Sequence, residues 1–146
     1  MTQTPTLNGQ DIGQAHRATR ALLERRLAAT GTEFNGWVTL NVLGSQGPIL
    51  AEDDLVSRVV QGLKVDDVVV RDVVTQLLDQ GLIDRTSDGV PQISLTASGI
   101  DLSDHVKETI AQITERLYGG LPVEELAIAH RILAAVTARA NAELNA

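Results

Sequence analysis

The chain has 146 residues, of which 43% are hydrophobic and only 2% aromatic. This length and composition fit one ordinary soluble domain with an aliphatic core and exclude two large domains. No apolar run approaches the roughly 18 residues that a membrane span needs, so we expect no membrane partner and a cytoplasmic location. The lack of cysteine excludes disulfides, thiolate zinc sites and a cysteine nucleophile.

The charge balance and the motif content narrow the function further. A formal net charge of -7 argues against indiscriminate nucleic-acid binding, although a local basic patch is compatible with it. The sequence contains no nucleophile elbow, phosphate loop or metal-ligand spacing. Its three histidines, His16, His105 and His130, are too scattered for a linear metal motif. We therefore predict neither an enzyme nor a bound cofactor or metal.

Periodic apolar residues predict three helices in the first half of the chain. The first helix ends near Gly31, a residue type suited to a helix C-terminus. Its apolar face comprises Ile12, Ala15, Thr19, Leu22, Leu23 and Leu27. The second helix begins near Thr32, an N-cap candidate, and ends at Gly44 and Gly47-Pro48. The third begins at the acidic run 52–54 and buries Leu55, Val59 and Leu63.

A valine-rich segment and a hairpin follow. Residues 65–80 keep a helical apolar period through Leu77, and Gly81 suits the left-handed position after a helix, so we prefer a helix to a strand. Two strands over 82–86 and 90–95 flank Asp88-Gly89, a strong signal for a tight turn. Pro91 predicts that the second of these strands lies at an exposed sheet edge.

Two long helices complete the chain. Thr96 or Ser98 caps the first of them, and Gly119-Gly120 ends it. Its apolar stripe comprises Leu102, Val106, Ile110, Ile113 and Leu117. Pro122 opens the second helix. The apolar residues of that helix are Leu126, Ala129, Leu133, Val136, Ala140 and Leu144.

The predicted order is four helices, a two-stranded hairpin and two more helices. Three helices followed by a hairpin form a winged helix, a helix-turn-helix variant in which the helix before the hairpin enters the DNA major groove. The long flanking helices carry more apolar surface than a small core can cover, which favours a two-fold homodimer. The fold class that we predict is mainly α with a small β-hairpin wing.

Two segments carry a family resemblance. The stretch 63–85, LKVDDVVVRDVVTQLLDQGLIDR, fits a recognition helix that ends in Leu-x-x-x-Gly-Leu-Ile-x-Arg, and LTASG at 95–99 fits a Leu-Thr-x-x-Gly step into a dimerisation helix. In their order and spacing they resemble the MarR (multiple-antibiotic-resistance regulator) family of dimeric winged-helix transcription factors. The resemblance implies one domain over 1–146, with the winged helix at about 32–96 and dimerisation helices at 7–31 and 97–146.

The same resemblance implies that the fourth helix, the wing and nearby cations contact operator DNA. The candidate DNA-contacting residues are Arg58, Lys64, Arg71, Thr75, Arg85 and Gln92. Helical geometry directs Asp67, Val68, Arg71, Asp72 and Thr75 away from the core face. The alternative is that Arg71 pairs with Asp67 on a solvated face, and that Asp66, Asp67 and Asp72 serve the helix N-terminus or solubility.

Two departures from the family pattern affect this surface. The family wing carries an Asp-x-Arg element whose arginine enters the minor groove, whereas the stretch 86–92, TSDGVPQ, has no arginine. From Glu52 to Val90, nine acids and four bases leave a local charge of -5, and carboxylates repel phosphates. These departures support a second hypothesis, a degenerate winged-helix dimer that has lost DNA recognition and binds ligands or proteins instead.

Members of the family commonly bind small aromatic or lipophilic effectors between the dimerisation helices and the winged domain. On that resemblance, Trp37, His16 and Arg20 are candidate ligand-binding residues. The alternatives are that Trp37 is a packing anchor, that His16 is a surface histidine, and that the arginines of the first helix form a solvated face. Our leading hypothesis is a homodimeric DNA-binding regulator whose partners are operator DNA, a second copy of itself and a small effector.

Overall fold

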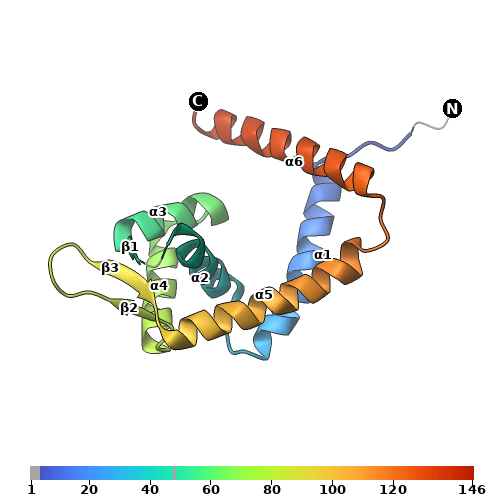
Figure 1. The fold of residues 1–146 in the computed structure, drawn as a ribbon. Helices are drawn as coiled ribbons and strands as arrows, with labels where there is room; N and C mark the ends of the chain where they lie inside the picture. Colours follow the sequence, from blue (N-terminus) through green and yellow to red (C-terminus); the bar gives the residue numbers. More distant parts are fainter. Residues whose placement is uncertain (1–3, 48) are drawn as a thin grey trace. The chain divides into compact units, whose positions relative to one another are not determined.

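The computed structural model describes residues 4–47 and 49–146, and confirms the predicted mainly helical fold (Figure 1). The helices are α1 (Gly9–Ala28), α2 (Phe34–Gln46), α3 (Glu52–Leu63), α4 (Asp67–Asp79), α5 (Ala97–Tyr118) and α6 (Val123–Leu144). The strands are β1 (Ile49–Ala51), β2 (Ile83–Arg85) and β3 (Gln92–Leu95). The order of the helices matches the prediction, but β1 is an additional strand.

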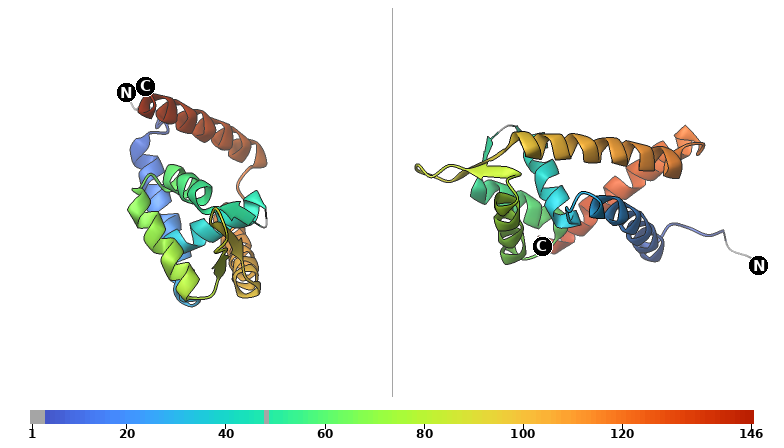
Figure 2. Two further views of the ribbon diagram at one scale, coloured as in Figure 1. Left: turned by 90° about the vertical axis from the view of Figure 1, so that its left-hand side faces the viewer. Right: turned by 90° about the horizontal axis from the view of Figure 1, so that it is seen from below.

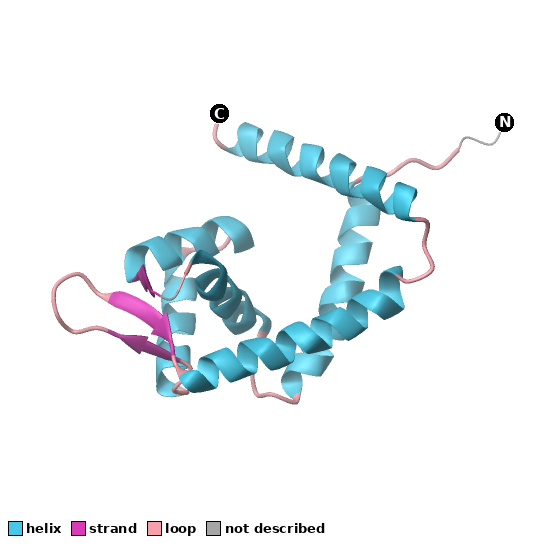
Figure 3. Ribbon diagram, in the orientation of Figure 1, coloured by secondary structure: helices cyan, strands magenta, loops and turns pink. Residues whose placement is uncertain are grey.

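The three strands form one antiparallel sheet in the order β1-β3-β2 (Figure 3). The central strand β3 pairs Ile93 with Leu50 on one side and with Arg85 on the other. The prediction that Pro91 marks an edge strand is therefore wrong. Pro91 lies just before β3, where no ladder donor is required, and its carbonyl accepts a hydrogen bond from the Glu52 amide at 3.0 Å.

Local capping explains where several helices begin. At α1, the Asn8 side chain accepts from the Asp11 amide at 3.0 Å, and the Asp11 carboxylate accepts from the Asn8 amide at 3.3 Å, a reciprocal capping box. Of the two candidates for α5, Thr96 is the cap, because its hydroxyl accepts from the Gly99 amide at 3.0 Å. The Thr96 hydroxyl also donates to the Gly81 carbonyl at 2.7 Å, which ties the start of α5 to the end of α4.

The predicted boundaries of α2 are corrected at both ends. Thr32 is buried and does not cap the helix, because α2 begins at Phe34 with Glu33 in the N-cap position. The helix then continues through Gly44 to Gln46, and Gly47 follows with φ of 119°. The predicted stop at Pro48 lies outside the described residues. Helix α4 is also shorter than the predicted range 65–80 and begins at Asp67.

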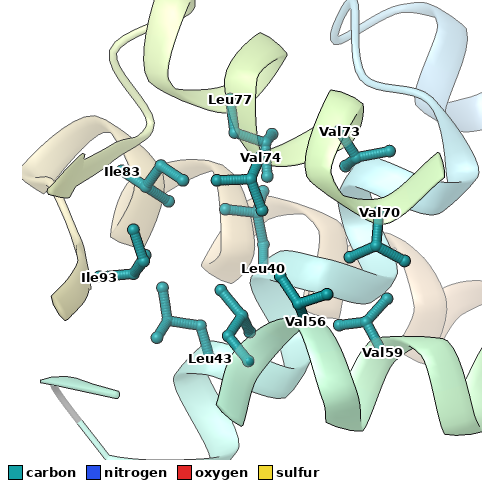
Figure 4. Close-up of a cluster of buried hydrophobic side chains, with 11 residues drawn as sticks. Leu40, Leu43, Val56, Val59, Val70, Val73, Val74, Leu77, Ile83 and Ile93 are labelled. Carbon is teal, nitrogen blue, oxygen red and sulfur yellow. The ribbon is translucent and has the colours of Figure 1, made fainter. Parts of the chain in front are cut away.

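The main core fills the space between α2, α3, α4 and the sheet (Figure 4). Leu40 and Leu43 of α2 meet Val56 and Val59 of α3, and Ile93 contributes from β3. From α4 the core receives Val70, Val73, Val74 and Leu77. Because these four aliphatic side chains pack into the main core, one side of α4 is buried and the opposite side faces solvent.

A smaller cluster joins α1 and α2 to the first half of α5. It consists of Leu27, Trp37 and Val106, with Leu23 and Ile110 packed against it. Figure 2 shows the hairpin of β2 and β3 extending past α4, as a wing does.

The chain divides into two compact units, the first ending at Ala111 and the second covering Gln112–Ala146. The assignment of one domain to residues 1–146 stays a prediction. Within the second unit, α6 has no buried residue. None of the helices in the described part of the chain is long and apolar enough to cross a membrane.

Candidate nucleic-acid interface

The exposed side of α4 is the surface on which the predicted DNA contacts depend. Asp67, Val68, Arg71, Asp72 and Thr75 all lie on it, as helical geometry predicts. In the first turn of α4, Val68 is 64% exposed and Val69 is 39% exposed. The helix thus presents a mixed surface of carboxylates, one guanidinium, one hydroxyl and an aliphatic patch.

Arg71 lies between two carboxylates. Its Nη2 donates to Oδ1 of Asp53 on α3 at 3.3 Å, and its Nε donates to Oδ2 of Asp67 one turn earlier on α4 at 3.4 Å. These contacts, first the hydrogen bond to Asp53 and then that to Asp67, raise the pKa of Arg71 above its ordinary value. The guanidinium is therefore charged and partly neutralised by its neighbours, yet its side chain remains 47% exposed.

The hydrogen bonds of Thr75 and Lys64 are local. The Thr75 hydroxyl donates to the Arg71 carbonyl at 3.1 Å, and Lys64 donates from Nζ to the Gln61 carbonyl at 2.7 Å. Lys64 ends α3 in a left-handed conformation with φ of 58° and lies in the turn between α3 and α4. Both side chains are exposed and can exchange these contacts for phosphate oxygens.

The remaining predicted contacts lie on α3 and the wing. Arg58 is exposed on α3. Arg85, at the end of β2, donates to the carboxylate of Glu52 at the start of α3 through both Nε and Nη2. Gln92 is the first residue of β3. Its backbone amide donates to the Thr86 hydroxyl at 3.0 Å, and its side chain is exposed.

The three predicted ligand-binding residues do not come together. Trp37 is buried at 6% exposure in the smaller core cluster, whereas His16 is exposed on α1. Arg20 lines an open cavity of about 400 Å³ where α1 meets the start of α2. Its guanidinium lies 4.2 Å from the centre of the Phe34 ring and its Nε donates to Glu24 at 2.7 Å. Neither Trp37 nor His16 lines that cavity.

Several features of these sites were missed by sequence reasoning. The sequence predicts Glu52 and Asp53 at a helix N-terminus, a position that they occupy, but it does not predict their ion pairs with Arg85 and Arg71, which span 33 and 18 residues. No local spacing signals such pairs. The pairing of Arg71 with Asp67, by contrast, follows from a separation of four residues on a helix.

Comparison with solved structures identifies proteins of similar fold. No family model matches the sequence, and no curated protein matches it. Solved structures do match. The reduced form of MarR from E. coli shares 17% identity over 92% of this chain and 98% of its own, with a TM-score of 0.72. A MarR-family transcriptional regulator from Rhodococcus sp. RHA1 shares 20% identity over 90% and 96%, with a TM-score of 0.73.

The fold is that of the MarR-family regulators. A third match, BpsR of Bordetella bronchiseptica, shares 20% identity over 93% of this chain and 98% of its own, with a TM-score of 0.73. The resemblance that the sequence motifs suggested is thus confirmed at the level of the MarR fold. In this fold α4 corresponds to the predicted recognition helix and the β2-β3 hairpin to the wing, each in the order that the sequence predicts.

Proposed function

We propose that the chain is a homodimeric, DNA-binding transcriptional regulator of the MarR type. The observation that supports this most is the placement of α4. Four buried aliphatic residues fix one side of the helix, its other side is open to solvent, and the wing follows directly. A recognition helix needs this arrangement, because its outer side chains must reach base edges while the domain holds its orientation.

A small effector is part of the proposal. The structure of BpsR is described as explaining regulation of its DNA binding by 6-hydroxynicotinic acid, an aromatic acid. In the present chain, the cavity that contains Arg20 and Phe34 offers an aromatic ring and a guanidinium that an effector could contact, although Glu24, which pairs with Arg20, and Glu33 also line it. Effector binding would change the spacing of the two recognition helices, so that they no longer fit major grooves one turn, about 34 Å, apart.

A footprint on the DNA upstream of the chain's own gene tests the regulator directly. The expected result is two protected half-sites whose centres lie one helical turn apart, about 10 base pairs. Protection without paired half-sites would contradict the dimeric mode of binding. A uniform cleavage pattern on this DNA, with protein in excess, would contradict the proposal for this operator.

The acidic surface favours a second candidate function, a winged-helix module that binds a protein or ligand instead of DNA. Two of the four predicted cations on this surface, Arg71 and Arg85, already bind carboxylates of the same chain. Phosphate contacts normally supply much of the affinity for DNA, so pairing of these cations weakens the case for DNA. Failure to bind any duplex at low salt would make this candidate the leading one.

A further inference from the structure

In the first turn of α4, Val68 is the residue that points most directly away from the core. Successive residues of an α-helix are rotated by about 100°, so Val68 lies nearly opposite the mean direction of the four core residues of this helix. Val69 lies about a quarter-turn from that mean direction, which agrees with its lower exposure. A helix that enters the major groove contacts base edges with residues near its N-terminus, the place that Val68 occupies.

Val68 is an apolar position in a polar row. Asp72 and Thr75 follow it at separations of four and seven residues, so the three side chains lie along one line of the helix, and all are exposed. Among the described residues, Val68 belongs neither to the main core nor to the smaller cluster. The fold therefore does not depend on this side chain, and its outer surface is open to a partner.

A valine side chain restricts which base can lie against it in the major groove. It has no donor or acceptor, so a polar base edge pressed against it loses water without gaining a hydrogen bond. Guanine presents two acceptors in the major groove, adenine an acceptor and a donor, and cytosine a donor. Thymine alone presents a methyl group, at C5, beside its acceptor. Apolar contact in the groove therefore favours thymine.

We infer that Val68 contacts the C5 methyl group of one thymine in each half-site of the operator. This role rests on the proposed function, because it requires α4 to enter the major groove. It deepens that function by making Val68 a specificity-determining residue, which reads sequence without any of the cations on the acidic surface. In a two-fold dimer the same thymine recurs in both half-sites.

Replacement of thymine by deoxyuridine removes this methyl group and leaves the base pair intact. Each thymine of the two half-sites located by the footprint is replaced in turn, always in both half-sites together. Fluorescence anisotropy with the full-length native protein then measures the affinity of each duplex. Loss of one buried methyl group weakens binding about fourfold, so one position should show about fifteenfold weaker binding when both half-sites are changed.

Val68→Ser separates a contact with the methyl group from an effect of deoxyuridine on the duplex itself. The variant lacks both methyl groups of valine, so deoxyuridine at the sensitive position should change its affinity by less than about twofold. Val69→Ser is the matched control in the same turn, and it should keep the full deoxyuridine effect. Both variants should melt at the temperature of the native protein, because neither side chain packs in the main core. Equal sensitivity to deoxyuridine in Val68→Ser and the native protein would overturn the contact.

Two negative results distinguish this inference from the proposed function. Saturable binding of the unmodified upstream DNA, with no position at which deoxyuridine weakens it, would overturn the role of Val68 and leave the proposed regulator intact. No binding of the unmodified duplex at about 50 mM salt would contradict the proposed function, and the role of Val68 with it.

Discussion

Arg71 shows how one residue connects the two candidate functions. Its side chain is half-exposed on the outer side of α4, as a DNA contact requires. It also forms ion pairs with Asp53 and Asp67, as expected of a solvated helix surface that does not bind DNA. Exposed ion pairs of this kind contribute little to stability and exchange readily. Arg71 can therefore leave its carboxylates when a phosphate or a guanine edge offers a better partner.

Arg71→Ala should weaken operator binding by at least about fivefold and reduce the salt slope by about one, because one cationic contact is lost. Anisotropy titrations at several salt concentrations measure both quantities. Arg25→Ala, an exposed arginine in the last turn of α1, is the control and should leave both unchanged. Equal affinity and slope in Arg71→Ala and the native chain would remove Arg71 from the interface.

Asp53→Asn should have the opposite effect and strengthen DNA binding a few-fold, because it releases Arg71 and removes one repulsive charge. The gain should disappear in the Asp53→Asn, Arg71→Ala double variant, a coupling that a double-mutant cycle measures. The pKa of Arg71 is raised from an ordinary value already far above neutral, so any stabilisation from its charge is lost only at very alkaline pH. The effect of Asp53→Asn should therefore be the same at pH 6 and pH 8; a strong pH dependence would indicate another group.

At the scale of elements, periodicity predicted the helices well because their apolar faces repeat every three or four residues. The strand β1 was missed, since three residues give too short a pattern, and it forms only because β3 offers it a partner. The prediction of an edge strand at Pro91 is wrong for the same reason, because β3 pairs with β1. A local pattern shows that proline cannot donate to a ladder, but it cannot show that a distant strand covers the other side of β3.

The candidate site was predictable only in part for a similar reason. The outward face of α4 follows from helical geometry, and so does the pairing of Arg71 with Asp67. The Arg20 cavity is lined only by residues within the stretch 20–35, but an apolar period does not show how the chain turns between α1 and α2 to form it.

Gly99→Ala tests the junction between the wing and α5. A Cβ at Gly99 would lie 2.1 Å from the Leu82 carbonyl oxygen, so α5 would have to move away from the end of α4 and β2. We expect a loss of about 2 kcal/mol in the free energy of unfolding, measured by urea denaturation. Gly62→Ala, a helical glycine with open space around its Cβ, should be neutral or stabilising. A loss no larger in Gly99→Ala than in Gly62→Ala would show that the junction tolerates a side chain.

At the scale of the whole molecule, α6 carries apolar surface that the chain does not bury. Ile128, Ile132 and Val136 follow one another at helical spacing and are each more than 40% exposed. Aliphatic side chains in this number on one helix are expected to pack against a partner helix. In the proposed homodimer, this surface would pack against the second copy of the chain.

Ile132→Glu should therefore convert a dimer into a monomer, as measured by light scattering after size exclusion. The charge would be buried without a partner in the dimer but exposed in the monomer. Ala138→Glu, which lies about 120° around α6 from Ile132 and outside the stripe of Ile128, Ile132 and Val136, should leave the dimer intact. A native chain that remains monomeric at about 100 µM, far above the dissociation constant of a stable dimer, would contradict self-association.

The central claim, that the acidic winged helix still reads DNA, is tested most directly by fluorescence anisotropy. The native protein is titrated into its own upstream DNA and an unrelated duplex, each at about 50 mM and about 200 mM salt. We expect binding to the upstream DNA to be about a thousandfold tighter than to the unrelated duplex, and to weaken as salt rises. No binding to either duplex at the lower salt concentration would contradict the claim and leave a winged-helix module that binds proteins or small ligands.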